Sequence, residues 1–207
     1  MCNPLQENCY VVSDESRECV IIDCGAYYPE EHEALDSYIR NHQLTPVHLL
    51  ATHGHLDHNF GNAHIFSQYA LKVEVCTEDC QLVEQLQEQA SSLFGMTIDE
   101  QQPPVGRLLS SDDEISFGSH TLRVLHTPGH SRGSCLFYCA GEHTAFTGDT
   151  LFRMSIGRTD FAEGSWNDMQ QSLHHVISKL PPETIVLPGH GPQSTIADEL
   201  QYNPYLR

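Results

Sequence analysis

The sequence carries little positive charge. Its 10 lysines and arginines stand against 28 aspartates and glutamates, which gives a formal net charge of -18. Nucleic-acid backbones and anionic membrane surfaces repel such a chain unless a local basic patch attracts them. The lysines and arginines form no cluster along the sequence. We therefore expect neither nucleic acid nor a membrane as a partner.

Long apolar runs are also missing. The longest, such as VHLLA at 47–51 and CVII at 19–22, are far shorter than the roughly 20 residues that span a bilayer. The first residues do not show the basic segment followed by an apolar one that is typical of an export signal. These two absences predict a soluble protein that stays in the cytoplasm.

The eight cysteines are an even number, so a disulfide framework has to be considered. Disulfide-stapled proteins are typically exported and short, whereas this chain has no visible export signal and is long enough to build its own core. The pairs Cys76/Cys80 and Cys135/Cys139 are separated by three residues, unlike the two-residue gap of zinc knuckles and redox motifs. We expect reduced cysteines, most of them buried.

Strand-like and helix-like segments alternate through the first half of the chain. Residues 9–14 and 18–25 are short β-branched runs that a polar turn separates, the pattern of a hairpin. Residues 29–43 begin with proline, are acidic in their first turn and have helical apolar spacing. The same patterns predict, in order, a strand at 47–53, a helix at 61–70, a strand at 72–77 and one long helix at 78–95.

The second half begins with a polar, proline-containing connection at 99–111. It continues with predicted strands at 114–127, 134–141 and 143–149, a helix at 166–180, a strand at 184–190 and a helix at 195–201. Heptads, low complexity and exact repeats are lacking, but the order of strands followed by helices occurs in each half. The sequence therefore predicts an α/β fold in layers, with helices on both outer faces.

The stretch THGHLDH places three histidines and an aspartate within six positions, at 53–58. His53 and His55 lie two apart at the end of a predicted buried strand, so both side chains should point the same way and suit a divalent cation. Asp57 and His58 follow where the chain turns, and a carboxylate beside an imidazole suits a second ion. A single histidine would be explained by a polar turn, but this group favours a metal site.

Three later stretches place one further ligand type each after a strand and next to glycine, where the backbone can approach closely. They are His130 in HTPGHSRGS, Asp149 in FTGDTLF and His190 in VLPGHGP. Any one of them alone would be an ordinary loop. Together with the first stretch they predict a shared metal centre at one end of the strands.

The combination of THGHLDH, TPGHSRGS, GDTLF and LPGHG resembles the metallo-β-lactamase superfamily, and the likeness extends over nearly the whole chain. This resemblance implies a single domain over residues 1–207, folded as a four-layer αββα sandwich with a binuclear metal centre at one edge. It implies one ion bound by His53, His55 and His130 and a second bound by Asp57, His58 and His190. Asp149 would bridge the two ions.

Within the superfamily, residues 149–165 and 188–206 resemble the glyoxalase II branch in its short bacterial form, which lacks the C-terminal helical domain that supplies basic residues for glutathione. The resemblance implies hydrolysis of S-lactoylglutathione or a related hydroxyacyl thioester by a hydroxide held between the ions. Asp57 would orient that hydroxide as the catalytic residue. Arg158 and Phe161 would bind the substrate, in place of the branch's lysine and its aromatic neighbour.

Histidine and aspartate ligands suit two divalent ions, with zinc preferred and iron or manganese as the other options. The segment GRTDF at 157–161 also resembles mononuclear iron persulfide dioxygenases, which is the main alternative. A true β-lactamase is disfavoured by the missing export signal, and a nuclease by the acidic charge. A non-catalytic metal-binding or sensor domain stays open as the alternative that is not an enzyme. The oligomeric state is left open.

Overall fold

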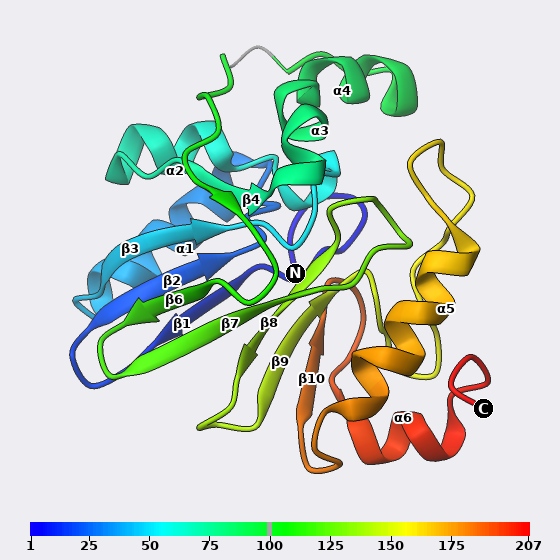
Figure 1. Ribbon diagram of the computed structural model, residues 1–207. Coiled ribbons are helices and arrows are strands. Elements are labelled where there is room, and N and C mark those ends of the chain that lie inside the picture. The colour runs from blue at the N-terminus through cyan, green and yellow to red at the C-terminus, as the bar shows by residue number, and fades with distance from the viewer. Residues whose placement is uncertain (99–100) are drawn as a thin grey trace.

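Two β-sheets lie face to face between two layers of helices (Figure 1). This arrangement is seen in the computed structural model of the chain, which describes residues 1–98 and 101–207. It is the single-domain αββα sandwich that the sequence predicted. Within the described residues, none of the helices has the length and apolar character that a bilayer crossing needs.

The first sheet has five strands in the order β1-β2-β3-β4-β5. Their bounds are β1 Tyr10–Ser13, β2 Glu18–Ile22, β3 Thr45–Leu50, β4 Val73–Cys76 and β5 Leu108–Leu109. The helices on its outer face are α1 Pro29–Asn41, α2 Asn62–Tyr69, α3 Cys80–Glu84 and α4 Leu86–Phe94. Strands β1 and β2 pair antiparallel as the predicted hairpin, whereas β2, β3, β4 and β5 run parallel.

The second sheet has six strands in the order β11-β10-β9-β8-β7-β6. Their bounds are β6 Glu114–Phe117, β7 His120–His126, β8 Cys135–Cys139, β9 Thr144–Gly148, β10 Ile185–Pro188 and β11 Ser194–Thr195. The helices α5 Trp166–His175 and α6 Ile196–Tyr202 cover its outer face, in orange and red in Figure 1. Only β9 and β10 pair in parallel within this sheet.

Three apolar clusters fill the three spaces between the four layers. Along β2, Ile21 packs toward the helices of the first half, and its neighbours Val20 and Ile22 pack between the sheets. Along β8, Phe137 lies between the sheets, while Leu136 packs in the cluster that contains α5 and α6. Successive side chains of a strand point to opposite faces, so strands that are buried on both sides are apolar at every position.

The predicted long helix at 78–95 divides at Gln85 into α3 and α4. At the break, the carbonyl oxygen of Leu82 accepts hydrogen bonds from the backbone N–H of Gln85 at 3.1 Å and from the Gln89 side chain at 2.8 Å. Strand β5 lies inside the connection that the sequence indicated as polar and irregular, of which residues 99–100 fall outside the described residues. The eight cysteines are unpaired thiols, five of them buried.

Candidate metal centre

Loops at one edge of the two sheets bring together the residues that the sequence predicted as metal ligands. The loop that follows β3 contains four of them, and the loops after β7, β9 and β10 contain one each. Ligand atoms on these loops form three overlapping groups, in each of which all atoms lie within 4.8 Å of one another. The groups are His53, His55 and His130; His53, His58 and Asp149; and Asp57, His58 and His190.

The first group consists of three buried imidazoles. The Nδ1 atom of His55 lies 2.9 Å from the Nε2 atom of His130, and the ring of His53 lies edge-on to both other rings. Strand β3 ends at Leu50, so His53 and His55 belong to the following loop and not to the strand as predicted. Their rings nevertheless meet, which is the outcome that the predicted alternation required.

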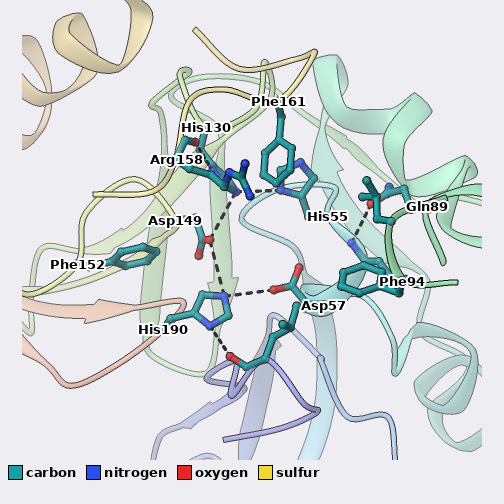
Figure 2. A pocket seen from close by; sticks show the side chains of 13 residues that line it. His55, Asp57, Gln89, Phe94, His130, Asp149, Phe152, Arg158, Phe161 and His190 are labelled. Atoms are coloured by element: carbon teal, nitrogen blue, oxygen red, sulfur yellow. Dashed lines mark hydrogen bonds and ion pairs between the residues drawn. The ribbon is translucent and has the colours of Figure 1, made fainter. Parts of the chain in front are cut away.

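Asp149 lies between His130 and His190 (Figure 2). Its Oδ1 atom is 3.3 Å from Nε2 of His58, and its Oδ2 atom is 3.5 Å from Nε2 of His130 and 3.7 Å from Nε2 of His190. On the other side, Nε2 of His190 is 3.2 Å from Oδ2 of Asp57. One carboxylate therefore contacts both halves of the cluster, as a bridging ligand must.

Several of these polar atoms are buried without a hydrogen-bond partner among the described residues. They include Nε2 of His53, Nε2 of His58 and Oδ1 of Asp149. A buried polar atom without a partner costs about 1–3 kcal/mol. These three atoms belong to the overlapping ligand groups, so a divalent cation would supply the missing partner of all of them. The donor set, imidazole and carboxylate, fits zinc, iron or manganese.

The protonation state differs among the candidate ligands. Burial, reinforced by the neighbouring imidazoles, lowers the pKa of His53 well below its ordinary value and keeps the ring neutral. Burial alone would raise the pKa of Asp149, but the imidazoles of His58 and His130 outweigh it, and the pKa lies below its usual range. His53 and Asp149 therefore have the forms that bind metals, a neutral imidazole and an ionised carboxylate. Burial lowers the pKa of His58, but Asp57 and Asp149 outweigh it and raise the pKa well above its ordinary value, so His58 would release a proton when an ion binds.

A buried aspartate that directly follows β2, Asp23, contacts the loop and one of the imidazoles of the cluster. Asp23 accepts hydrogen bonds from the backbone N–H and the hydroxyl of Thr52, each at 2.7 Å. Its Oδ2 atom also lies 3.1 Å from Nδ1 of His58. A carboxylate behind an imidazole fixes the orientation of the ring, so that the opposite nitrogen of His58 faces Asp149.

A second buried aspartate, Asp79, joins two of the ligand loops. Its Oδ2 atom accepts hydrogen bonds from the backbone N–H of Gly54 at 2.8 Å and from the hydroxyl of Ser131 at 2.6 Å. Its Oδ1 atom accepts one from the backbone N–H of Gly133 at 2.6 Å. Gly54 precedes His55, and Ser131 follows His130, so Asp79 sets the separation of these two ligands.

Two amide side chains complete this support. Gln89 on α4 accepts a hydrogen bond from the backbone N–H of Leu56 at 3.0 Å and donates one to the carbonyl of Gly54 at 3.0 Å. Asn59 donates to the carbonyls of His53 and His55 at 3.0 and 2.7 Å. Because these bonds fix the backbone on both sides of each histidine, the loop holds its shape without belonging to a strand.

The sequence patterns did not predict the role of these supporting residues. Asp23 and Asp79 follow shortly after strands β2 and β4, as Asp149 follows β9, so the same strand-end signal applied to them. The sequence instead placed Asp79 inside the long helix predicted at 78–95. No signal in the sequence singled out Gln89, which contacts a loop about 35 residues earlier.

A cleft of about 540 Å³ opens over the candidate ligands (Figure 2). Both residues predicted to bind substrate line it. The ring of Phe161 lies 5.0 Å from the ring of His55, and the guanidinium carbon of Arg158 lies 4.3 Å from the centre of the Phe161 ring. The other apolar residues that line the cleft are Leu5, Leu56, Leu93, Phe94 and Phe152.

A layered αββα sandwich with a histidine and aspartate cluster at one edge defines a class of metal-dependent enzymes. The chain belongs to the metallo-beta-lactamase superfamily, whose profile matches residues 2–190. It is 34% identical to the hydroxyacylglutathione hydrolase GloC of Haemophilus influenzae, over 97% of this chain and 93% of that protein. It is 32% identical to the probable metallo-hydrolase YqgX of Bacillus subtilis, over 98% of this chain and 93% of that protein.

Solved structures show the same fold. BLEG-1, described as a B3 metallo-beta-lactamase, has a TM-score of 0.90 at 36% identity, with 99% of this chain and 96% of that chain covered. TTHA1623 in a di-iron-bound form has a TM-score of 0.86 at 37% identity, with 99% and 97% covered. ETHE1 from Myxococcus xanthus has a TM-score of 0.78 at 26% identity, with 99% and 81% covered.

Proposed function

We propose that this metal-dependent enzyme is a binuclear thioester hydrolase that acts on S-lactoylglutathione or a related hydroxyacyl thioester. The observation that carries the proposal is the position of Asp149, whose two carboxylate oxygens face His58 on one side and His130 on the other. The similarity to the hydroxyacylglutathione hydrolase of Haemophilus influenzae over nearly the full length supports the same reaction. A small-molecule thioester is the expected substrate.

In this proposal the ligand groups hold two ions, one by three imidazoles and one by a mixed set, with Asp149 shared. The first set is His53, His55 and His130, and the second is Asp57, His58 and His190. Zinc is the preferred ion on the chemistry of these ligands. Iron fits the same donors, and the structurally similar TTHA1623 has been solved in a di-iron-bound form.

When bound, the two ions would lower the pKa of a water molecule toward neutrality and stabilise negative charge on the carbonyl oxygen. The chain's own part is to place the reactants. Burial raises the pKa of Asp57, but His58 and His190 reverse the shift, so the carboxylate is ionised at neutral pH. Asp57 lines the cleft and can therefore accept a hydrogen bond from the attacking water and orient it.

The reaction is a hydrolysis in which the water oxygen bonds to the thioester carbon and the carbon–sulfur bond breaks. The products are a hydroxy acid and a free thiol. Phe161, packed against the ring of His55, would exclude bulk water from one side of the reacting carbonyl. The buried ligand His55 would be held in place by this contact and by the loop bonds described above.

The experiment that tests this proposal is thiol release from S-lactoylglutathione by protein of known metal content. A parallel measurement follows oxygen uptake with glutathione persulfide. Thiol release by protein with two ions per chain supports the hydrolase. Absence of thiol release from S-lactoylglutathione and from other hydroxyacyl thioesters, with a fully metal-loaded protein, would overturn it.

A mononuclear iron persulfide dioxygenase is the second candidate. Two observations favour this candidate as much as the hydrolase. They are the segment Gly157–Phe161 and the likeness to ETHE1 from Myxococcus xanthus. The hydrolase has the further support of His190, whose Nε2 atom lies 3.2 Å from Asp57 and completes a second ligand group. Oxygen uptake by protein with one iron per chain would assign the chain to the dioxygenases.

A further inference from the structure

The mouth of the cleft has an apolar rim that the proposed chemistry does not use. Leu5, Leu93 and Phe94 lie there with 45%, 56% and 40% of their surface exposed. Large apolar side chains that gather beside a reactive site, rather than singly over a surface, indicate where a partner molecule makes apolar contact. Figure 2 shows Phe161 beside His55, and Phe94 on the side of Asp57 that faces away from His190.

The cleft also lacks a free positive group among its lining residues, all of which lie in the described part of the chain. Arg158 is the one lysine or arginine in this lining. Its Nε and Nη2 atoms donate to Oδ1 and Oδ2 of Asp160 at 2.6 and 2.8 Å, and its guanidinium stacks over Phe161. This bond lowers the pKa of Asp160 to about 2, so the pair is ionised on both sides.

Negative groups lie close by instead. Asp57 and Asp149 line the cleft, and Oε1 of Glu163 is 3.3 Å from Nε2 of His55. Glu163 lies outside the ligand groups. A substrate arm with carboxylates would therefore lie near these acidic side chains, and the one arginine of the lining is already paired with Asp160.

We propose that the preferred substrate is a thioester whose thiol arm is uncharged and apolar, and that this arm packs on Leu5, Leu93 and Phe94. The proposal rests on the thioester hydrolase function above and specifies its substrate class. The reaction is unchanged: water adds to the carbonyl carbon, the carbon–sulfur bond breaks, and a carboxylic acid and an apolar thiol leave. Asp160 contributes to the selectivity because its carboxylate already accepts the hydrogen bonds that the Arg158 guanidinium could otherwise donate to a substrate.

The test compares two thioesters with the same lactoyl group, S-lactoylglutathione and the S-lactoyl thioester of benzyl mercaptan. The metal-loaded protein should hydrolyse the benzyl thioester with a kcat/KM at least about tenfold higher than that for S-lactoylglutathione. An advantage of this size is expected when one aromatic ring is buried against an apolar surface. An equal or higher kcat/KM for S-lactoylglutathione would overturn the substrate class and leave the hydrolase function standing. Hydrolysis of neither thioester would overturn the hydrolase function as well.

Two phenylalanines provide a matched pair of variants. Phe94 on α4 and Phe66 on α2 are exposed to 40% and 39%, and only Phe94 lines the cleft. Phe94→Ser should lower the ratio of the two kcat/KM values about fivefold to tenfold, toward equality. Phe66→Ser should leave the ratio as in the wild type. A ratio that both variants change equally, or that neither changes, would contradict a role for the rim.

A third variant tests the charge argument. Asp160→Asn frees the guanidinium of Arg158, which should raise kcat/KM for S-lactoylglutathione about twofold to fivefold and thereby lower the selectivity. The double variant Asp160→Asn with Arg158→Ala should lose this gain. A gain that persists without Arg158 would overturn the role given to Asp160.

Discussion

The carboxylate of Asp79 accepts a hydrogen bond from the backbone N–H of Gly54 at 2.8 Å, between the candidate ligands His53 and His55. The same side chain accepts a bond from Gly133 at 2.6 Å, beyond the ligand His130. Loops about 75 residues apart in the sequence are thus fixed to one buried, charged side chain. The geometry of the three-imidazole group depends on a residue that binds no metal itself.

Asp79→Asn should weaken metal binding while preserving the fold. An amide has one acceptor oxygen, so it cannot accept from Gly54 and Gly133 at once, and the loss of such supporting bonds typically costs about 10–100-fold in metal affinity. Competition with a chromogenic chelator measures the affinity, and the visible spectrum of the cobalt-substituted protein reports the ligand geometry. Asp168→Asn, at an exposed aspartate on α5, is the control. Wild-type affinity and spectrum in Asp79→Asn would contradict the positioning role.

Gly133 should not tolerate a side chain, because a Cβ atom there would lie 2.6 Å from the backbone nitrogen of Asp79. Gly133→Ala should cost about 2 kcal/mol of unfolding free energy, as expected for an overpacked site, and should weaken metal binding. Gly141→Ala is the matched control, since its Cβ atom would have no heavy atom within 4 Å. Denaturant titration of the two variants checks this, and equal stabilities would refute the close approach.

Removal of the metal should destabilise the protein. Ions that bind only the folded state raise the unfolding free energy by mass action. The increase is about 4 kcal/mol when the free ion concentration is about 1,000 times the dissociation constant. Thermal unfolding with zinc and after chelation measures the difference. His55→Ala should reduce this metal-dependent gain, and His174→Ala, at an exposed histidine of α5, should keep it. A gain that His55→Ala leaves intact would place the ions elsewhere.

One ion pair predicts a pH dependence of stability apart from the metal. The hydrogen bond between His48 on β3 and Glu74 on β4 raises the pKa of His48 above its ordinary value. The folded-state pKa then exceeds the unfolded one of about 6.5, so the stabilisation is complete below that pH and is lost as the pH rises through the folded-state pKa.

Glu74→Gln should therefore cost stability at low pH, by about 1 kcal/mol, and little at high pH. Urea titrations of metal-free protein at about pH 6 and pH 9 measure the difference on either side of the His48 titration. Glu183→Gln, in an exposed pair 3.7 Å from His143, is the control and should have no effect at either pH. A loss for Glu74→Gln that is the same at both pH values would contradict the linkage.

The ligand residues were predictable from the sequence because closely spaced histidines and aspartates are uncommon and because each ligand lies shortly after a predicted strand. Histidines 53, 55 and 58 stand together after an apolar run, and Asp149 and His190 follow strands and adjoin glycines. Strands β7, β9 and β10 run in the same direction and therefore end at one edge of their sheet, and the loop after β3 of the other sheet meets them there. The apolar run before His53 likewise predicted a buried strand, and Leu49 and Leu50 at the end of β3 are buried.

The supporting residues and the cleft wall could not be predicted in the same way. Gln89 and Phe94 lie on a helix that local patterns describe as continuous with α3, whereas the chain breaks the helix at Gln85. Leu5 reaches the cleft from the N-terminal segment through contacts with the loop of His190. Such contacts depend on tertiary packing, which no window of the sequence contains.

The most direct test of the binuclear site counts metal ions per chain in wild-type protein and in Asp149→Ala, together with thiol release from both thioesters. The shared position of Asp149 predicts two ions per chain and turnover in the wild type, and loss of bound metal and of thiol release in the variant. Full thiol release by Asp149→Ala, or by wild-type protein that holds a single ion, would contradict the binuclear mechanism.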